Sequence, residues 1–480
     1  MRDYIFDIVY GTLEEKKHSD ELFHEICRKE TMHMARDRHF VQREALGTIE
    51  RAIELDEYLG AVSHTPVAKM DPVIRTILRM GTYELFYMDK VPDAAACNEM
   101  VLLTKRKKLG KYSGFVNGVL RNLARKDKEK LREEMAAKKR DIADKYSFLY
   151  AVPKELCTLL LTQYGKKSTK KMLAAFQETK PVCIRVHTKN ASPEEVRKEL
   201  EEAGIEVNEL PHLNEGFCLT HVENVETLPG FSEGHFTVQD ESSMLPGVIS
   251  GIKPGDRVLD VCASPGGKTF HAADLLKGKG HICARDVSEK KLIRIRENAV
   301  RLHEPEVEIK VWDARKEDPE WKEMADVILA DVPCSGIGVI GKKPEIRYDA
   351  VSHIEELVPI QREILNGILP ALKPGGTLIY STCTVSPQEN EENVAYLEEH
   401  FPLKRESLDE FLPESLRNKM TKEGMLQILP GVNGILEAGA RKRADALFLV
   451  VGGLPDGGAV HRLNGEGPGF AALTGEGQRG

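Results

Sequence analysis

Apolar, β-branched segments alternate with helix-like segments in the second half of the chain, from Phe236 to about Gly452. The strand candidates are rich in Val, Ile and Leu and read DRVLDVCA, HICARDV, VEIKVWDA, ADVILADVP and GTLIYSTC. The segments between them, such as SHIEELVPIQREILNGILPAL, carry apolar residues at helical spacing. This alternation predicts an α/β, Rossmann-like domain in which helices cover both faces of a parallel sheet. Ligands of such sheets bind beyond the carboxyl ends of the strands.

The 480 residues leave room for about three domains, and the pattern changes twice along the chain. Residues 1–139 show only helical periodicity, with a helix start at Asp71-Pro72, and predict an all-α bundle. Residues 140–235 mix strand-like PVCIRVHT and GFCLTHV with a helix-like SPEEVRKELEEAG, and predict a small α+β module. The Rossmann-like domain takes residues 236–452, and a glycine-rich tail, residues 453–480, is expected to be disordered.

Composition excludes several classes of protein. No apolar stretch approaches the roughly 18 residues of a membrane span, and the N-terminus lacks the features of a signal peptide. The nine cysteines are scattered and never form C-x-x-C. We therefore expect a cytoplasmic protein with neither a disulfide framework nor a metal site.

The net charge of −8 does not favour a nucleic-acid partner, but the charge is unevenly spread. One short region is crowded with basic side chains: Lys105, Arg106, Lys107, Lys108, Lys111, Arg121, Arg125 and Lys126. Such a run is either a contact for a polyanion or a solvated helix face, and the sequence leaves both open.

A glycine turn follows the first strand of the alternating region. In CASPGGKT, Gly266 and Gly267 allow a tight turn that brings backbone N–H groups to a ligand at the next helix. Cys262 stands where a phosphate-binding P-loop needs glycine, which disfavours a nucleoside triphosphatase. Asp286 and Asp313 end the next two strands, where carboxylates suit the ribose and the base of an adenosine-bearing cofactor.

A second glycine pattern is a weaker signal. Gly336, Gly338 and Gly341 fit G-x-G-x-x-G, but a dinucleotide-binding motif must open a helix directly. Here KKPEIRY follows, so we interpret these glycines as part of a substrate loop.

Two cysteines lie just past strand ends, Cys334 in DVPCSG and Cys383 in YSTCT. A lone cysteine of this kind is usually a small buried hydrophobe. Two on neighbouring strands, with Asp331 close by, indicate a pyrimidine-modifying enzyme. A thiolate that adds to carbon 6 of cytosine makes carbon 5 nucleophilic enough to take a methyl group from a sulfonium. A carboxylic acid such as Asp331 can help by protonating the ring nitrogen.

These motifs together resemble a known family. DVCASPGGKT, ARDVSEKKL, DVPCSGIG and YSTCTVSPQENEENV are similar to the RNA 5-methylcytosine methyltransferases of the NOL1/NOP2/Sun family. VPDAAACNEMVLLTKR and GFVNGVLRNL resemble a NusB-type RNA-binding domain, and residues 140–245 resemble the family's RNA-binding module ahead of the catalytic domain. The resemblance covers about residues 1–450.

The resemblance implies the roles of individual residues. Cys383 would be the nucleophile, Cys334 the thiol that assists product release, and Asp331 a further catalytic residue. S-adenosyl-L-methionine would be bound by Cys262, Ala263, Ser264, Pro265, Gly266, Gly267, Lys268, Asp286, Asp313 and Asp331. The implied partner is 16S ribosomal RNA, free or in an early assembly intermediate, and the implied enzyme is a monomer without a metal.

Three departures from the family pattern stand out. Ser264 replaces the usual alanine, and Trp312 replaces a glycine before Asp313. The family's last strand, aspartate-glycine-phenylalanine-phenylalanine, is poorly matched, with Asp445 to Phe448 as its best counterpart.

Two other functions remain open at this point. The same catalytic motifs fit a 5-methylcytosine methyltransferase for transfer RNA or large-subunit ribosomal RNA. A non-catalytic RNA-binding factor built on the NusB-like bundle is the alternative of another class, although the intact Asp331, Cys334 and Cys383 argue against it.

Overall fold

The computed structural model describes residues 1–29, 35–178, 181–210, 212–220, 222, 224–432 and 447–453. The glycine-rich tail for which we expected disorder therefore lies outside the described residues from residue 454 onward.

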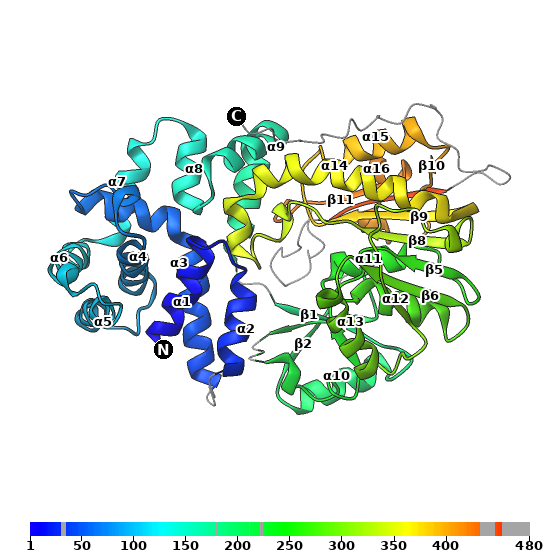
Figure 1. Cartoon of the computed structure of the whole chain (residues 1–480), viewed down its shortest axis with the longest axis horizontal. Helices are drawn as coiled ribbons and strands as arrows, with labels where there is room; N and C mark the ends of the chain where they lie inside the picture. The colour runs from blue at the N-terminus through cyan, green and yellow to red at the C-terminus, as the bar shows by residue number, and fades with distance from the viewer. Residues whose placement is uncertain are drawn as a thin grey trace, which may run out of the picture.

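The N-terminal part is a helical bundle, as the sequence predicted, and it forms one end of the elongated molecule (Figure 1). Its core consists of apolar residues at helical spacing, such as Val41, Ile49 and Leu120. Asp71 caps the fourth helix as expected, because its side chain accepts a hydrogen bond from the backbone N–H of Val73. The helices are α1 Arg2–Leu13, α2 Ser19–Lys29, α3 Ala35–Val62, α4 Pro72–Tyr87, α5 Asp93–Arg106, α6 Ser113–Ala124 and α7 Lys128–Lys138.

Two further helices, α8 (Ile142–Tyr150) and α9 (Lys154–Ala175), lie between the bundle and the sheet domain (Figure 1). Helix α9 bends at Gly165, whose φ of 69° only glycine adopts readily. Its apolar side packs in one cluster with Ile337 and Val385, which belong to loops of the C-terminal domain. Helix α9 is thus a structural part of the region that surrounds the two cysteines of interest.

The small α+β module is an antiparallel sheet with strand order β2-β3-β1-β4 and one helix. Its elements are β1 Val182–Val186, α10 Pro193–Glu202, β2 Glu206–Glu209, β3 Gly216–Thr220 and β4 Phe236–Val238. Helix α10 begins with a reciprocal capping box between Ser192 and Glu195. The sheet takes its fourth strand from residues 236–238, just past the boundary expected at residue 235.

A disulfide links Cys183 to Cys218 in this small sheet. The two residues are direct partners on the antiparallel strands β1 and β3. We expected no disulfide framework, and this one bond is a departure from that expectation. Side chains directly opposite each other on antiparallel strands approach closely enough to be bonded.

The C-terminal domain contains the predicted parallel sheet, with strand order β10-β12-β9-β8-β5-β6-β7 and β11 beside β12. Strands β5 to β9 are mutually parallel, whereas β12 runs antiparallel to β9. The strands are β5 Arg257–Asp260, β6 His281–Asp286, β7 Glu308–Val311, β8 Ala325–Asp331, β9 Leu372–Thr382, β10 Lys404–Arg405, β11 Met425–Ile428 and β12 Leu447–Gly453.

Helices cover both faces of this sheet (Figure 1). Neighbouring strand residues point to opposite faces, so Val258 packs with Phe270 of α12 while Leu259 packs with Leu365 of α14. Burial on both faces explains why the strands read as continuous apolar runs. The helices are α11 Glu241–Val248, α12 Gly267–Leu276, α13 Glu289–Arg301, α14 Ala350–Ile368, α15 Glu391–His400 and α16 Lys419–Lys422.

The poorly matched C-terminal segment does supply a strand. Strand β12 pairs with β9, with Phe448 opposite Thr382, and it also pairs with β11 and β10. Phe448 is fully buried in the core under α14 and α15. Asp445, the start of the expected counterpart, lies outside the described residues.

Candidate active site

The carboxyl ends of β5, β6, β8 and β9 lie along one edge of the parallel sheet, and the predicted site residues follow these ends. The glycine turn connects β5 to α12. Gly266 has a φ of 106°, and a Cβ atom there would lie 2.5 Å from the ring of Phe270, so the turn requires glycine on both counts. Helix α12 begins at Gly267, which leaves backbone N–H groups free to face a ligand at this edge.

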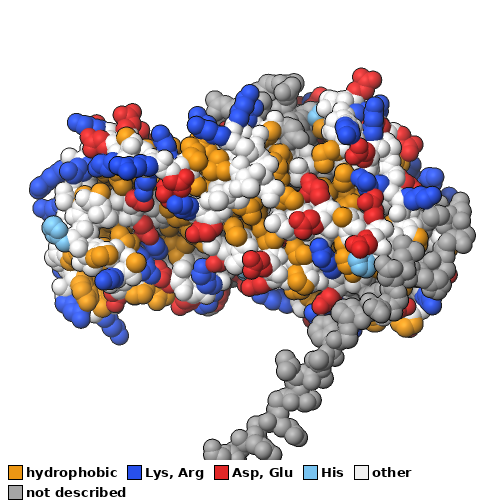
Figure 2. Space-filling view, turned by 90° about the horizontal axis from the view of Figure 1, so that it is seen from above, with side chains coloured by type: hydrophobic (Ala, Val, Ile, Leu, Met, Phe, Trp, Pro, Cys, Tyr) orange, Lys and Arg blue, Asp and Glu red, His pale blue; other side chains and the backbone are white. Residues whose placement is uncertain are grey.

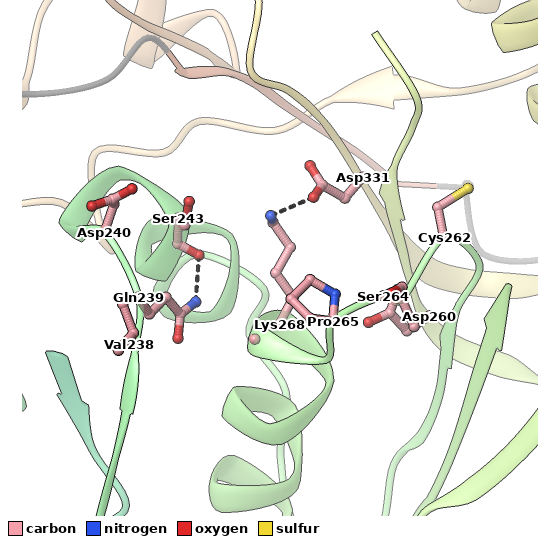
Figure 3. A pocket seen from close by; sticks show the side chains of 12 residues that line it. Val238, Gln239, Asp240, Ser243, Asp260, Cys262, Ser264, Pro265, Lys268 and Asp331 are labelled. Atoms are coloured by element: carbon pink, nitrogen blue, oxygen red, sulfur yellow. Dashed lines mark hydrogen bonds and ion pairs between the residues drawn. The ribbon is translucent and has the colours of Figure 1, made fainter. Parts of the chain in front are cut away.

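The Lys268 ammonium and the Asp331 carboxylate form an ion pair across this edge, with 2.6 Å between Nζ and Oδ2 (Figure 3). The Ser381 hydroxyl donates to the other oxygen of Asp331 over 2.8 Å. Burial alone would lower the pKa of Lys268, but the charge of Asp331 and its hydrogen bond raise it overall. Lys268 is therefore a fixed cation, and Ser381 and Lys268 together hold the orientation of Asp331.

Asp260, at the end of β5, is a buried carboxyl group beside this pair. Burial raises its pKa to about 7, although a hydrogen bond from the Thr269 hydroxyl (2.6 Å) opposes the rise. Its Oδ1 atom has no hydrogen-bond partner within the described part of the chain. Asp260 thus changes charge in the physiological pH range.

A cavity of about 230 Å³ opens where these residues meet. One wall is the turn at Cys262, Ala263, Ser264, Pro265, Gly267 and Lys268 with Asp260 and Asp331; the other is Val238, Gln239, Asp240 and Ser243. The second wall comes from the end of β4, the start of α11 and the two residues between them (Figure 3). Lys342, from the glycine loop after β8, pairs with Asp240, so that loop contacts the same wall.

The two predicted thiols lie side by side at the same edge of the sheet. The Sγ atoms of Cys334 and Cys383 are 3.2 Å apart, and the backbone N–H of Cys383 donates to Cys334 Sγ over 3.3 Å. The hydrogen bond with Cys383 and burial both raise the pKa of Cys334 well above its usual value. Cys334 is therefore held as a neutral thiol in the absence of substrate.

Asp286 and Asp313 also lie at strand ends but do not line the 230 Å³ cavity. Asp286 is buried and accepts a hydrogen bond from the backbone N–H of Ser264 (3.2 Å), and Lys291 Nζ lies 3.1 Å from it. Asp313 forms a two-pronged ion pair with Arg315, whose hydrogen bonds lower the pKa of the carboxyl group. Asp286 thus links the glycine turn to the end of β6, whereas Asp313 is paired with Arg315, two positions further along the chain.

Residues that the sequence reasoning did not single out surround the thiols. Gln361, Glu389, Asn390 and Asn393 are fully buried polar residues behind the two cysteine loops. Glu389, Asn390 and Asn393 come from PQENEENV, which carried the family resemblance, whereas Gln361 lies on α14. A run of polar residues within a few positions of the end of a buried strand could have indicated an internal hydrogen-bond network.

The basic run of the bundle lies on α5 and α6 and the turns around them, at the end of the molecule away from the sheet (Figure 1). Two of its members are paired within the bundle, Arg106 with Asp3 (2.9 Å) and Lys107 with Asp7 (2.8 Å). Figure 2 shows many Lys and Arg side chains over this helical end.

Within the described residues, no cluster of His, Cys, Asp or Glu could hold a metal ion. No described helix is both long and apolar enough to cross a membrane.

Comparisons with known proteins match this architecture domain by domain. Residues 249–436 match the family described as 16S rRNA methyltransferase RsmB/F, and residues 1–125 match the NusB family. Residues 152–226 match the ferredoxin-like domain of RsmF/B-like methyltransferases. The three matches confirm the NusB-like bundle, the small α+β module and the methyltransferase domain that the sequence predicted.

Curated relatives resemble the chain over most of its length. A probable ribosomal RNA small subunit methyltransferase B of Synechocystis is 34% identical over 400 residues, 82% of this chain and 88% of the relative. The Bacillus subtilis protein of the same name is 33% identical over 83% of this chain and 89% of its own length.

A solved structure, PH0851, superposes with a TM-score of 0.77 at 25% identity and covers 94% of this chain and 98% of its own. A methyltransferase homologue from Pyrococcus horikoshii is 27% identical, with a TM-score of 0.51, and covers 64% of this chain and 98% of its own.

The methyltransferase match confirms the predicted cofactor, S-adenosyl-L-methionine. The site fits such a group, because the cavity has the carboxyl groups of Asp260 and Asp331 and the ammonium of Lys268 in one wall and adjoins the N-terminus of α12, where backbone N–H groups can face a ligand. From its fold, its domain order and its relatives, the chain belongs to the RsmB/F family of ribosomal RNA methyltransferases.

Proposed function

We propose that this enzyme methylates carbon 5 of one cytosine in 16S ribosomal RNA through a covalent bond between Cys383 and the base. The observation that carries the proposal is the pair of sulfur atoms 3.2 Å apart beside the Lys268–Asp331 ion pair. Two thiols are what a reaction needs when one must add to a ring and later be expelled from it. The matched family and the curated relatives are named for small-subunit RNA, which supports 16S over the alternatives.

The thiolate of Cys383 forms a bond to carbon 6, and the electron pair of the 5,6 double bond moves to carbon 5. S-adenosylmethionine, when bound, supplies a methyl group whose bond to the sulfonium is already weakened by positive charge. The new carbon–carbon bond leaves carbon 5 with both a methyl group and its original proton. That proton must leave before the 5,6 double bond can return.

Asp331 and Lys268 act on the cytosine ring during addition. Their ion pair holds one acceptor and one donor at fixed positions in the cavity wall, at the same edge of the sheet as the thiols. The sequence suggested Asp331 as the acid that protonates the ring nitrogen, but its ion pair with Lys268 leads us to give the donor role to the ammonium. Asp331 can accept a hydrogen bond from the exocyclic amino group, and the Lys268 ammonium can donate to the ring and stabilise the negative charge that addition creates. Both roles depend on the Ser381 hydroxyl, which keeps Asp331 in place.

Cys334 serves the elimination step. Its raised pKa keeps a proton on its sulfur, 3.2 Å from the sulfur of Cys383. It gives this proton to the departing Cys383 sulfur as the bond to carbon 6 breaks, and in the same step its sulfur takes the proton from carbon 5 while the 5,6 double bond forms. The thiols then hold two protons, one more than at the start, and the methylated base is free; Cys383 returns to the thiolate by losing the extra proton to water before the next cycle. The neutral state of Cys334 also argues against it as the attacking thiolate.

For the cofactor we propose that residues 262–268 and Asp286 hold the adenosine and methionine parts. Asp286 fixes the turn through Ser264 and places a negative charge at the second strand end. Asp313 completes the set at the third strand end, which requires that it exchange part of its contact with Arg315 for the base.

For the RNA we propose that α9 provides phosphate contacts next to the site. Lys166, Lys167, Lys170 and Lys171 are exposed after the bend at Gly165, and none forms an ion pair within the described part of the chain. The other side of the helix packs on the cysteine loops, and Tyr164 donates a hydrogen bond to the backbone carbonyl of Val385 over 2.6 Å. A helix is about 10–12 Å wide, so a strand bound to these lysines passes close to the thiols.

Bisulfite sequencing of ribosomal RNA from cells that lack the gene tests this function. One cytosine of 16S RNA should lose its methylation, and the purified enzyme should restore it on a 16S transcript. Loss of methylation in transfer RNA or 23S RNA instead would assign the enzyme to those substrates. Unchanged methylation everywhere would favour a non-catalytic RNA-binding factor.

A further inference from the structure

Two adjacent residues, Glu389 and Asn390, contact the loops of the two thiols separately. Both lie just before α15 and are fully buried. Neither residue lines the cavity in which we place the cofactor and neither is one of the thiols, so we expect any effect on the reaction to act through other residues.

Glu389 and Gln361 hold the backbone on both sides of Cys334. One carboxylate oxygen of Glu389 accepts from the backbone N–H of Ser335 over 2.8 Å. The Gln361 amide donates to that same oxygen (3.0 Å) and to the carbonyl of Pro333 (2.9 Å). The residues immediately before and after Cys334 are thereby tied to one buried pair of side chains.

Asn390 does the same for Cys383. Its side-chain carbonyl accepts from the Thr382 hydroxyl over 2.7 Å, and its amide donates to the backbone carbonyl of Thr384 over 3.2 Å. The residues on both sides of Cys383 are thus held by a single side chain.

The Cys334 loop, held by Glu389, and the Cys383 loop, held by Asn390, are joined by a pair of hydroxyl groups. Ser335 follows Cys334, Thr384 follows Cys383, and their hydroxyl oxygens are 2.7 Å apart. The Ser335 hydroxyl also donates to Glu389. The carboxylate of Glu389 has no cationic partner within the described residues, so its buried charge is satisfied by these hydrogen bonds alone. A buried charge is costly unless such bonds are complete, which favours one fixed arrangement.

We propose that Glu389 positions Cys334 for product release and that Asn390 positions Cys383 for attack. The inference rests on the proposed roles of the two thiols. It assigns the two halves of the reaction to neighbouring side chains that touch neither substrate nor cofactor. Both are positioning residues, and their loss should therefore cause two different kinetic defects.

The test compares Glu389→Ala and Asn390→Ala in the full-length enzyme with a 16S transcript and labelled S-adenosylmethionine. Glu389→Ala should keep single-turnover methyl transfer within about threefold and slow multiple turnover by about tenfold or more, the equivalent of one or two lost hydrogen bonds. It should accumulate a protein–RNA adduct on denaturing gels. Asn390→Ala should slow single-turnover transfer by about tenfold or more with no added adduct.

Glu392→Ala is the matched control, because Glu392 is exposed in the same turn of chain and should behave as wild type. Glu389→Gln should turn over much faster than Glu389→Ala and close to the wild-type rate. The glutamine amide can donate to the Ser335 hydroxyl while its carbonyl still accepts from Ser335 N–H. If Glu389→Ala does not fold, Ser335→Ala can replace it, because it removes the hydroxyl that donates to Glu389. This variant should also accumulate the protein–RNA adduct, because release of the product is slowed more than methyl transfer.

Equal losses in both steps for both variants, or an adduct in Asn390→Ala and none in Glu389→Ala, would overturn the assignment. Cys334→Ala, measured in parallel, separates this failure from that of the proposed function. If Cys334→Ala accumulates adduct and Glu389→Ala does not, the thiol roles stand and the positioning role of Glu389 falls. If Cys334→Ala accumulates none, the thiol roles themselves are wrong.

Discussion

The sulfur atoms of Cys334 and Cys383 lie 3.2 Å apart although the residues are 49 positions apart in the sequence. Their strands, β8 and β9, are parallel neighbours with Asp331 opposite Ser381, so both cysteines leave the sheet at the same edge. The register of one strand pair therefore assembles the thiols, Asp331 and the hydroxyl that orients it.

The pKa of Asp260 predicts a pH-dependent stability. Folding raises this pKa from an ordinary value near 3.8 to about 7. The native state then binds the proton more tightly than the unfolded state, so the stabilisation is complete below the unfolded pKa and is lost as the pH rises through about 7.

Asp260→Asn should remove this loss and keep the hydrogen bond from Thr269. At pH 8 the variant should be more stable than wild type by on the order of 2 to 4 kcal/mol, with a smaller difference at pH 5. Thermal unfolding measured from pH 5 to pH 8 checks this. Parallel stability curves for the two proteins would show that Asp260 stays ionised throughout.

Asp286→Asn should weaken cofactor binding by about tenfold or more, because the change removes a buried charge and loosens the turn at Ser264. Calorimetry with S-adenosylmethionine measures this directly. Asp256→Asn is the control, since Asp256 lies before β5 at the opposite edge of the sheet. Equal affinities for all three proteins would remove Asp286 from the cofactor site.

Neutralising Lys166, Lys167, Lys170 and Lys171 to Gln should lower RNA affinity and flatten its salt dependence. Each phosphate contact to a single strand contributes about 0.7 to the slope of log K against log salt, so the slope should fall by about two to three. Anisotropy of a labelled 16S-derived oligonucleotide between about 50 and 200 mM salt measures it.

The matched control neutralises four exposed lysines at the amino edge of the sheet, Lys253, Lys277, Lys279 and Lys322. A third variant neutralises Lys105, Lys108, Lys111 and Lys126 in the basic run of the bundle. If the α9 variant keeps the wild-type slope while the bundle variant loses it, the RNA binds along the bundle instead.

The parts of the fold that depend on local pattern were predictable. Val258 and Leu259 face opposite cores, so their strand is apolar throughout and could be recognised without knowing its neighbours. The thiols could be placed together because parallel neighbouring strands end at one edge. The cofactor turn could be recognised because a backbone at a φ of 106° needs glycine.

The remaining features depend on contacts between distant segments. The disulfide between Cys183 and Cys218 requires the register of β1 against β3, which the residues alone do not fix. The ion pairs of Arg106 and Lys107 in the basic run could not be predicted, because their partners, Asp3 and Asp7, come from the first helix, about a hundred positions earlier. The role of α9 depends on its packing against Val385, 221 residues from Tyr164.

Covalent trapping tests the central claim most directly. Wild type, Cys334→Ala and Cys383→Ala are incubated with a 16S transcript and S-adenosylmethionine, denatured, and separated on gels that resolve protein–RNA adducts. Cys334→Ala should transfer the methyl group once and accumulate an adduct, because no thiol remains to complete the elimination. Cys383→Ala should form none. An adduct that accumulates in Cys383→Ala and is absent in Cys334→Ala would contradict the account and make Cys334 the nucleophile.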